Sequence, residues 1–189
     1  ETFDTSSYKI KKISRKDFDY VYDYKKLSHI INKFKPEIII NCAAIVKIDN
    51  CEKKPNLAYE VNSLFPYWLS IISQKINAIF IHFSTDAVFE GTKKTTYTVN
   101  DTPFPTTIYG KSKLLGEKYI SHYKKTLIVR LSLLYGKHHK NQIIYTLFNK
   151  LKRNKKIFVA KDIYCTPTNS EDIATFIKKK IDNSKINKL

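Results

Sequence analysis

Residues 78–84, Ala78-Ile79-Phe80-Ile81-His82-Phe83-Ser84, form a short apolar run that is followed directly by a polar segment ending at Gly91. Such runs, rich in β-branched and aromatic residues and bounded by turn residues, are typical of strands buried on both faces. Two similar runs occur at residues 37–41 and 126–131. Weaker candidates for strands are residues 8–13 and 157–160. The sequence therefore predicts at least three buried strands.

Amphipathic segments alternate with these runs, and each predicts a helix. They cover residues 24–34, 56–75, 107–123, 142–152 and 170–181, the last with Ser170 as its expected N-terminal cap and acidic residues in its first turn. Strands that alternate with helices predict a parallel sheet with helices on both faces, an α/β Rossmann-like doubly wound fold. Ligands bind such sheets at the carboxyl ends of the strands, which here follow Asn41, Ser84 and Leu131. Residues 91–105 are polar, contain prolines and predict a loop.

The composition is that of a globular protein. Of the 189 residues, 42% are hydrophobic, and no apolar run reaches the roughly 18 residues that a membrane-spanning helix needs. The first residues do not resemble a signal peptide, so we expect a cytoplasmic protein. The formal net charge is +17, but the lysines are dispersed and only three arginines occur, so we expect no specific nucleic-acid partner. Three widely spaced cysteines predict neither a disulfide framework nor a metal site.

Tyr109 and Lys113 lie four residues apart, a spacing that places both side chains on one face of a helix. A lysine in that position favours the phenolate, so we expect it to lower the pKa of Tyr109 and allow proton exchange near neutral pH. The same spacing occurs at Tyr8 and Tyr22, so it is not specific alone. Only Tyr109 follows a strand that ends in a hydroxyl, that of Thr85, which could bind the carbonyl oxygen that a tyrosine protonates. The alternatives are a solvated helix face for the pair and a turn or helix cap for Thr85.

These residues carry a resemblance to a known family. Ser84-Thr85-Asp86-Ala87-Val88-Phe89-Glu90-Gly91, together with Tyr109-Gly110-Lys111-Ser112-Lys113-Leu114-Leu115-Gly116-Glu117, resembles the extended short-chain dehydrogenases, in particular the dTDP-4-dehydrorhamnose reductase family. Asn41-Cys42-Ala43-Ala44 and Asn62 resemble the family's turn and helix beside the cofactor. Residues 129–136 and 162–174 are similar to its segments near the substrate. Asp19-Tyr20 resembles the pair that flanks the adenine.

The resemblance implies a reaction and a role for each residue. The family uses NADPH or NADH to reduce the 4-keto group of a sugar nucleotide in dTDP-L-rhamnose biosynthesis. By resemblance, Tyr109 donates the proton, Thr85 holds the ketone oxygen, and Lys113 binds the nicotinamide ribose and tunes Tyr109. The residues expected to contact the cofactor are Asp19, Tyr20, Asn41, Cys42, Ala43, Ala44, Asn62, Tyr109 and Lys113. Residues 1–134 would form the nucleotide-binding domain and residues 135–189 the start of a substrate-binding region. The sequence is compatible with a homodimer.

Several departures from the family leave alternatives open. The family begins with a strand, a Gly-x-x-Gly-x-x-Gly turn and a helix that receives the pyrophosphate, but this sequence contains no methionine and no glycine before Gly91. We therefore expect a domain truncated at its N-terminus that binds cofactor poorly: a fragment, a degraded gene product or a functional short form. Leu133 replaces an aromatic residue of the substrate site, so the sugar stays open, as does NADH against NADPH. A non-catalytic regulatory or binding subunit of the same fold, similar to that of methionine adenosyltransferase, is the alternative function.

Overall fold

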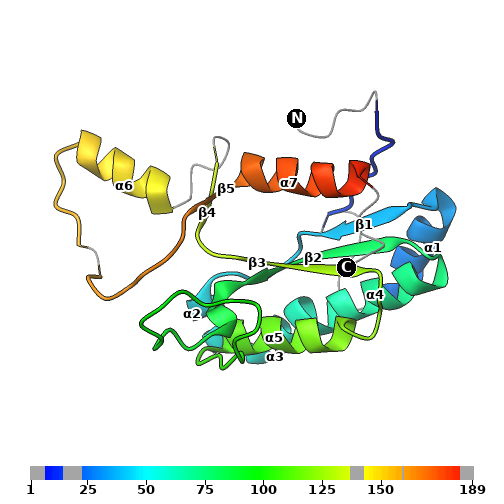
Figure 1. Cartoon of the computed structure of the whole chain (residues 1–189), viewed down its shortest axis with the longest axis horizontal. Helices are drawn as coiled ribbons and strands as arrows, with labels where there is room; N and C mark the ends of the chain where they lie inside the picture. Colours follow the sequence, from blue (N-terminus) through cyan, green and yellow to red (C-terminus); the bar gives the residue numbers. More distant parts are fainter. Residues whose placement is uncertain (1–6, 15–22, 137–142, 159, 184–189) are drawn as a thin grey trace.

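A parallel three-stranded sheet forms the centre of the molecule (Figure 1). The computed structural model describes residues 7–14, 23–136, 143–158 and 160–183. The strands β1 (Ile38–Asn41), β2 (Ile79–Thr85) and β3 (Thr126–Leu131) lie in the order β1-β2-β3. Asn41, the last residue of β1, pairs with His82, so β2 continues three residues further to Thr85, which pairs with Leu131 of β3. The three strands predicted from the clear apolar runs are all present, and their carboxyl ends meet at one edge of the sheet.

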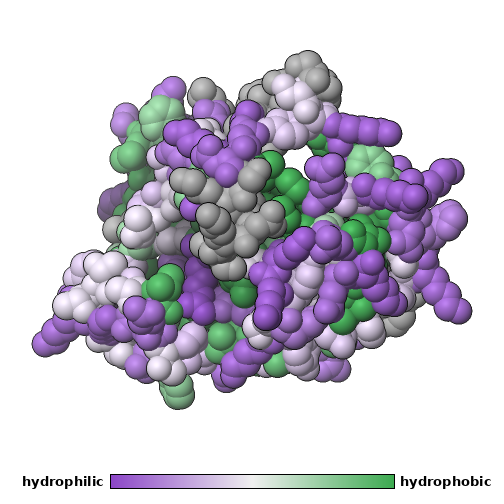
Figure 2. Space-filling model, turned by 45° about the vertical axis from the view of Figure 1, so that its right-hand side comes forward, coloured by the Kyte–Doolittle hydropathy of each residue, from purple (hydrophilic) through white to green (hydrophobic). Residues whose placement is uncertain are grey.

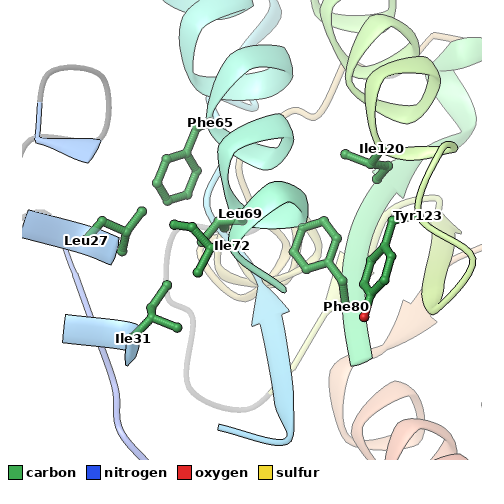
Figure 3. Close-up of a cluster of buried hydrophobic side chains, with 8 residues drawn as sticks. All are labelled: Leu27, Ile31, Phe65, Leu69, Ile72, Phe80, Ile120 and Tyr123. Carbon is green, nitrogen blue, oxygen red and sulfur yellow. The ribbon is translucent and has the colours of Figure 1, made fainter. Parts of the chain in front are cut away.

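Helices cover both faces of this sheet, which confirms the α/β doubly wound class. Figure 1 shows α4 (Phe65–Lys75) and α5 (Ile108–Ile120) on one face and α7 (Ser170–Asp182) on the other. On the first face, α1 (Tyr24–Phe34), α4, α5 and β2 share a hydrophobic core (Figure 3), with the buried residues Leu27, Ile31, Phe65, Leu69, Ile72, Phe80, Ile120 and Tyr123. On the second face, Ile177 of α7 packs with Ile81 of β2. Side chains alternate across a strand, which explains why Phe80 and Ile81 enter different cores.

The segment expected as one helix over residues 56–75 contains a change of helix type. It consists of α3 (Pro55–Tyr59), the π-helical turn η1 (Glu60–Leu64) and α4. The turn η1 lies against α5, where a β-carbon added to Gly116 would come 2.3 Å from the carbonyl oxygen of Asn62. The Ser63 hydroxyl donates to the carbonyl of Ser112 on α5 at 2.6 Å. We infer that the wider turn brings these polar groups to α5, as π-turns at functional sites often do.

The connection from β2 to α5 is the expected loop. After β2, the short 3₁₀ turn η2 (Asp86–Val88) is followed by residues 89–107 without helix or strand. The Tyr97 hydroxyl accepts from the backbone N–H groups of Gly91 and Lys93, each at 3.1 Å, and Lys93 pairs with Asp101 at 2.7 Å. The Thr107 hydroxyl then caps α5 by accepting from the N–H of Gly110 at 3.1 Å. The loop is thus tied at both of its ends.

Two of the weaker strand predictions are wrong. Residues 8–13 form no strand: the Tyr8 hydroxyl donates to Asp182 of α7, and Ile13 packs at the margin of the first core. Residues 157, 158 and 160 are also outside any strand. A second, two-stranded sheet instead pairs β4 (Leu134–Tyr135) with β5 (Thr168–Asn169). Residues 8–13 are placed by side-chain contacts with neighbouring helices, which the local sequence does not reveal.

The remaining helices are α2 (Ile48–Lys53), beside the turn that follows β1, and α6 (Ile143–Lys152), which lies apart from the sheet in Figure 1. The N-terminal cap of α7 is Asn169, whose side chain accepts from the N–H of Glu171 at 2.9 Å, and not Ser170 as expected. Within the described ranges, no helix is long and apolar enough to cross a membrane. Figure 2 shows hydrophilic side chains over much of the face in view, with separate hydrophobic patches between them.

Replacing Gly116 with alanine should destabilise the fold. In an isolated helix this change is stabilising by roughly 0.5–1 kcal/mol, but here the new β-carbon would meet the Asn62 carbonyl. We expect a loss of about 1–3 kcal/mol in the free energy of unfolding, measured by urea denaturation. The matched control is Lys118→Ala on the exposed side of the same helix, which should change stability by less than about 0.5 kcal/mol. A stabilised Gly116→Ala variant would contradict the close packing of α5 on η1.

Candidate active site at the carboxyl ends of the strands

The end of β2 and the start of α5 bring Thr85 and Tyr109 together. Thr85 is the last residue of β2, and its hydroxyl accepts from the N–H of Ala87 at 3.1 Å and donates to Asp86 at 3.2 Å. The Tyr109 side chain, in the first turn of α5, lies near enough to Thr85 for the Thr85 hydroxyl to lower the pKa of the phenol. Thr85 therefore caps η2, as one alternative held, and also contacts the tyrosine. The two roles are compatible because a hydroxyl has one donor and two lone pairs.

Gly110 is what lets Tyr109 come this close to β2. A β-carbon at Gly110 would lie 2.2 Å from the carbonyl oxygen of Ala87 and 2.9 Å from the β-carbon of Pro105. Any larger residue would push the first turn of α5 away from η2. The glycine after the tyrosine is therefore part of the geometry of the site.

The pKa of Tyr109 lies above its usual value, which corrects the expectation from the sequence. Burial raises this pKa most, the hydrogen bond to Thr85 opposes the rise, and the negative charges of Asp86 and Cys51 add to it. Lys113 is not among the groups that shift it. The phenol of Tyr109 is therefore protonated at neutral pH, and it can act as a proton donor before it can act as a base.

Lys113 is buried in the second turn of α5, with 1% of its surface exposed. Its Nζ donates to the backbone carbonyl of Phe83 at 2.6 Å and lies 3.2 Å from Nε2 of His82. Burial lowers the pKa of Lys113 to about 8, against the opposing charge of Glu117. The amine points to β2 and is partly uncharged near neutral pH, which explains why it does not lower the pKa of Tyr109.

Two buried asparagines hold the turn that follows β1. The Asn41 side-chain oxygen accepts from the N–H of Ala43 at 3.0 Å. Asn62 accepts from the N–H of Ile45 at 2.9 Å and donates to its carbonyl at 3.0 Å, and it also donates to the Ser112 hydroxyl at 3.0 Å. The amide of Asn62 is thus fully engaged within the protein, where it supports the turn that follows β1. Within that turn Cys42 is exposed, and Ala43 and Ala44 are half-buried.

Sequence reasoning missed three residues at this site. His82 is fully buried, and its Nδ1 lies 3.0 Å from Nδ2 of Asn41. Glu117, on α5, forms a bidentate ion pair with Arg130 of β3 at 2.6 and 3.0 Å, and Arg130 also lies over the ring of Phe89 at 5.1 Å. For His82 and Arg130, the available signal was an ionisable residue inside a predicted strand (residues 78–84 and 126–131), since strands buried on both faces are otherwise apolar.

One buried hydroxyl at this edge has no partner. Ser84 Oγ is buried and makes no hydrogen bond in the structure, and such a group inside a site is available to a ligand. Asp19 and Tyr20, expected beside the adenine, lie outside the described residues. Among the residues that the structure does describe, no three His, Cys, Asp or Glu side chains are grouped as metal ligands would be.

Comparison with known proteins gives concordant matches. A family model described as the RmlD substrate binding domain matches residues 1–188. The spore coat polysaccharide biosynthesis protein SpsK of Bacillus subtilis is 34% identical over 160 residues, covering 84% of this chain and 56% of that protein. The crystal structure of dTDP-4-dehydrorhamnose reductase from Bacillus anthracis in complex with NADP superimposes with a TM-score of 0.89 at 32% identity, covering 95% of this chain and 64% of that one.

A relative of another kind also matches. Methionine adenosyltransferase 2 subunit beta of Rattus norvegicus is 31% identical over 161 residues, covering 83% of this chain and 48% of that protein. The chain spans about half the length of the curated relatives it matches.

The raised pKa of Tyr109 can be measured by ultraviolet titration of phenolate formation. The difference between the wild-type chain and Tyr109→Phe isolates one tyrosine among 13. We expect its midpoint above the usual value of about 10, because burial disfavours the phenolate. Tyr119→Phe, at an exposed position of the same helix, is the matched control. A difference spectrum that develops near neutral pH would contradict the present geometry and restore the lowered pKa expected from the Tyr109–Lys113 spacing.

Proposed function

We propose that this chain forms the reacting part of an NADPH- or NADH-dependent enzyme that reduces the 4-keto group of a sugar nucleotide. The premise is that the chain belongs to the RmlD substrate binding domain family. The observation that carries the proposal is the meeting of Thr85 and Tyr109 at the carboxyl end of β2, with Lys113 one turn further along α5. The similarity to dTDP-4-dehydrorhamnose reductase, at 32% identity, supports this reaction.

Each residue then has a chemical task. The ketone oxygen of the sugar would accept hydrogen bonds from Tyr109 and from Thr85, and together they would polarise the carbonyl. For this the Thr85 hydroxyl proton would turn from Asp86 to the ketone oxygen. The nicotinamide supplies the hydride to the carbonyl carbon. Tyr109 gives its proton to the developing alkoxide, a task for which a phenol kept protonated by burial is suited. The closeness of α5 to η2, enforced at Gly110, keeps the proton donor in line with the hydroxyl of Thr85.

The residues present fit one half of the cofactor. Lys113, Tyr109 and the free hydroxyl of Ser84 are donors suited to the nicotinamide ribose, and the turn of residues 41–45 lies at the same edge of the sheet, where Asn41, Cys42, Ala43 and Ala44 would contact it. Asn62 would support that turn. Asp19 and Tyr20 would flank the adenine. The sequence has no Gly-x-x-Gly-x-x-Gly motif for the pyrophosphate.

The wider assignment follows from the same proposal. Residues 1–134 would form the nucleotide-binding domain, and residues 135–189 the beginning of the region that binds the sugar. The substrate would be a dTDP-linked 4-keto-6-deoxy sugar, the protein would act in the cytoplasm, and it would associate, if at all, as a homodimer. Leu133 stands where the family has an aromatic residue, so contacts to the sugar ring would be weaker than in the family.

A second function has one observation in its favour. The match to methionine adenosyltransferase 2 subunit beta, at 31% identity, supports a regulatory or binding subunit without catalysis. The presence of Thr85, Tyr109 and Lys113 favours the reductase. Turnover separates the two.

Cofactor affinity is the first property to measure. We expect this chain to bind NADPH and NADH weakly, with a Kd of about 1 mM or higher, because its sequence contains no glycine-rich motif for the pyrophosphate. Calorimetric titration of the purified chain measures this, with the double substitution Tyr109→Phe and Lys113→Ala as the comparison. Micromolar binding that the double substitution abolishes would contradict the expected weak affinity and support the site. Micromolar binding that survives the substitution would contradict the site itself.

Reduction of a dTDP-4-keto-6-deoxy sugar at saturating NADPH, followed by loss of NADPH absorbance, tests the reaction. Tyr109→Phe should reduce kcat by roughly 10²–10⁴, because the proton donor is lost. Lys111→Gln, at an exposed position of α5 between Tyr109 and Lys113, should retain the wild-type rate. Absence of turnover in the wild-type chain at saturating NADPH would overturn the reductase proposal for this chain and leave the regulatory subunit.

A further inference from the structure

Three buried polar side chains form a continuous line beneath the site. Asn41 on β1, His82 on β2 and Lys113 on α5 have 3%, 0% and 1% of their surfaces exposed. His82 lies between the other two: its Nδ1 is 3.0 Å from Nδ2 of Asn41, and its Nε2 is 3.2 Å from Nζ of Lys113. The line thus joins the amine of the site to the turn after β1.

The hydrogen-bond partners fix which nitrogen of His82 carries its proton. The side-chain oxygen of Asn41 accepts from the N–H of Ala43, so the amide NH₂, which can only donate, faces Nδ1 of His82. Nδ1 must then be the accepting nitrogen, and the proton of the neutral ring lies on Nε2, facing Lys113. An ammonium group has no acceptor for that N–H, whereas the lone pair of an uncharged amine accepts it. As drawn, the line therefore suits an uncharged Lys113.

A charged Lys113 requires the opposite arrangement. The ammonium donates to Nε2, the proton of His82 moves to Nδ1, and the Asn41 amide turns over so that its oxygen accepts from Nδ1. The N–H of Ala43 then faces an NH₂ group and loses its acceptor. The two arrangements differ by one proton, which resides on Lys113, and the hydrogen bond from Ala43 favours the uncharged one.

The charged groups around the amine do not take over the effect of the Ala43 hydrogen bond on the charge of Lys113. Glu117, one turn further along α5, favours the charged form of Lys113, but Arg130 of β3 holds both oxygens of that carboxylate. His82 stays neutral because burial and the nearby Lys113 hold its pKa well below 6.5. No carboxylate pairs with Lys113 among the salt bridges of the described residues.

We propose that His82 is a positioning residue whose tautomer couples the charge of Lys113 to the orientation of the Asn41 amide, and hence to the turn of residues 41–45. If the proposed function holds, contacts that the cofactor makes with this turn and with Lys113 are linked through His82. A change in the charge of Lys113 is then accompanied by a change in the hydrogen bonding of the turn, with no movement of the backbone of β2 required.

Nuclear magnetic resonance tests the coupling without cofactor or substrate. The Cε resonance of Lys113, assigned by its loss in Lys113→Arg, reports the charge of the amine. Long-range ¹H–¹⁵N spectra of His82, assigned by their loss in His82→Gln, report the protonated ring nitrogen. We expect both to change with one midpoint at about pH 8, with the proton on Nδ1 below it and on Nε2 above it. A single His82 tautomer while Lys113 titrates would overturn the proposal.

Variants separate the relay from simple charge effects. In Asn41→Asp, one carboxylate oxygen accepts from Ala43 and the other from His82 Nδ1, so the conflict disappears. We expect this variant to hold His82 in the Nδ1–H form and to raise the Lys113 midpoint by at least one pH unit, on the order of the shifts that single neighbours produce. The added charge alone would do so equally in a His82→Phe background, so an equal rise there would overturn the relay. Lys111→Gln should leave both midpoints unchanged.

The coupled titration of Lys113 and His82 can succeed or fail independently of reductase turnover. A coupled titration with no reductase turnover would leave the relay in place and remove the reaction. Turnover with an invariant His82 tautomer would do the reverse.

Discussion

The close packing of α5 on the turns η2 and η1 is the constraint on which the rest of the site depends. Two glycines, six residues apart on this helix, face backbone oxygens at distances that no β-carbon could occupy, 2.2 Å from Ala87 and 2.3 Å from Asn62. Gly110 sets the distance from the first turn of α5 to η2, which follows β2 directly, and therefore brings Tyr109 to Thr85. Gly116 sets the distance to η1, and therefore brings Ser112 within hydrogen-bond reach of Asn62 and Ser63. The position of this one helix thus determines both how close Tyr109 lies to Thr85 and how the turn after β1 is supported.

The electrostatic cost of this packing falls on Lys113. A lysine is almost never fully buried without a partner, and here its amine meets a backbone carbonyl and a neutral imidazole. The nearest carboxylate, that of Glu117, is already held by Arg130 in a bidentate pair. An ordinary structural helix would solve this problem with a shorter or apolar residue. A desolvated amine held by a carbonyl and an imidazole is the kind of arrangement that is found more often at functional sites than in purely structural packing.

Local pattern predicted much of this fold, and its failures have identifiable causes. The apolar spacing of Leu27, Ile31 and Phe34 predicted α1 with the bounds that the structure has, because one face of that helix packs on a single core. The division of residues 55–75 at η1 was missed, because it arises from contacts with α5, about 50 residues away. Thr85 at the end of a predicted strand, followed by Tyr109 at the start of the next predicted helix, was enough to predict that the two residues meet. The direction of the Tyr109 pKa was wrong, because spacing on a helix does not show that Lys113 points to Phe83.

The distribution of binding groups along the chain has a consequence for how it would use binding energy. The residues described here surround the place where chemistry would occur, whereas the sequence lacks the motif that grips the pyrophosphate. In dehydrogenases of this fold, contacts with remote phosphates supply affinity, and contacts near the reacting carbon are most useful when they strengthen in the transition state. Thr85 and Tyr109 belong to the second kind, since charge develops on the oxygen they would share. Under the proposed function, a chain with this half of the site would keep the groups that polarise a ketone while it binds cofactor weakly, so affinity and chemistry would be separable.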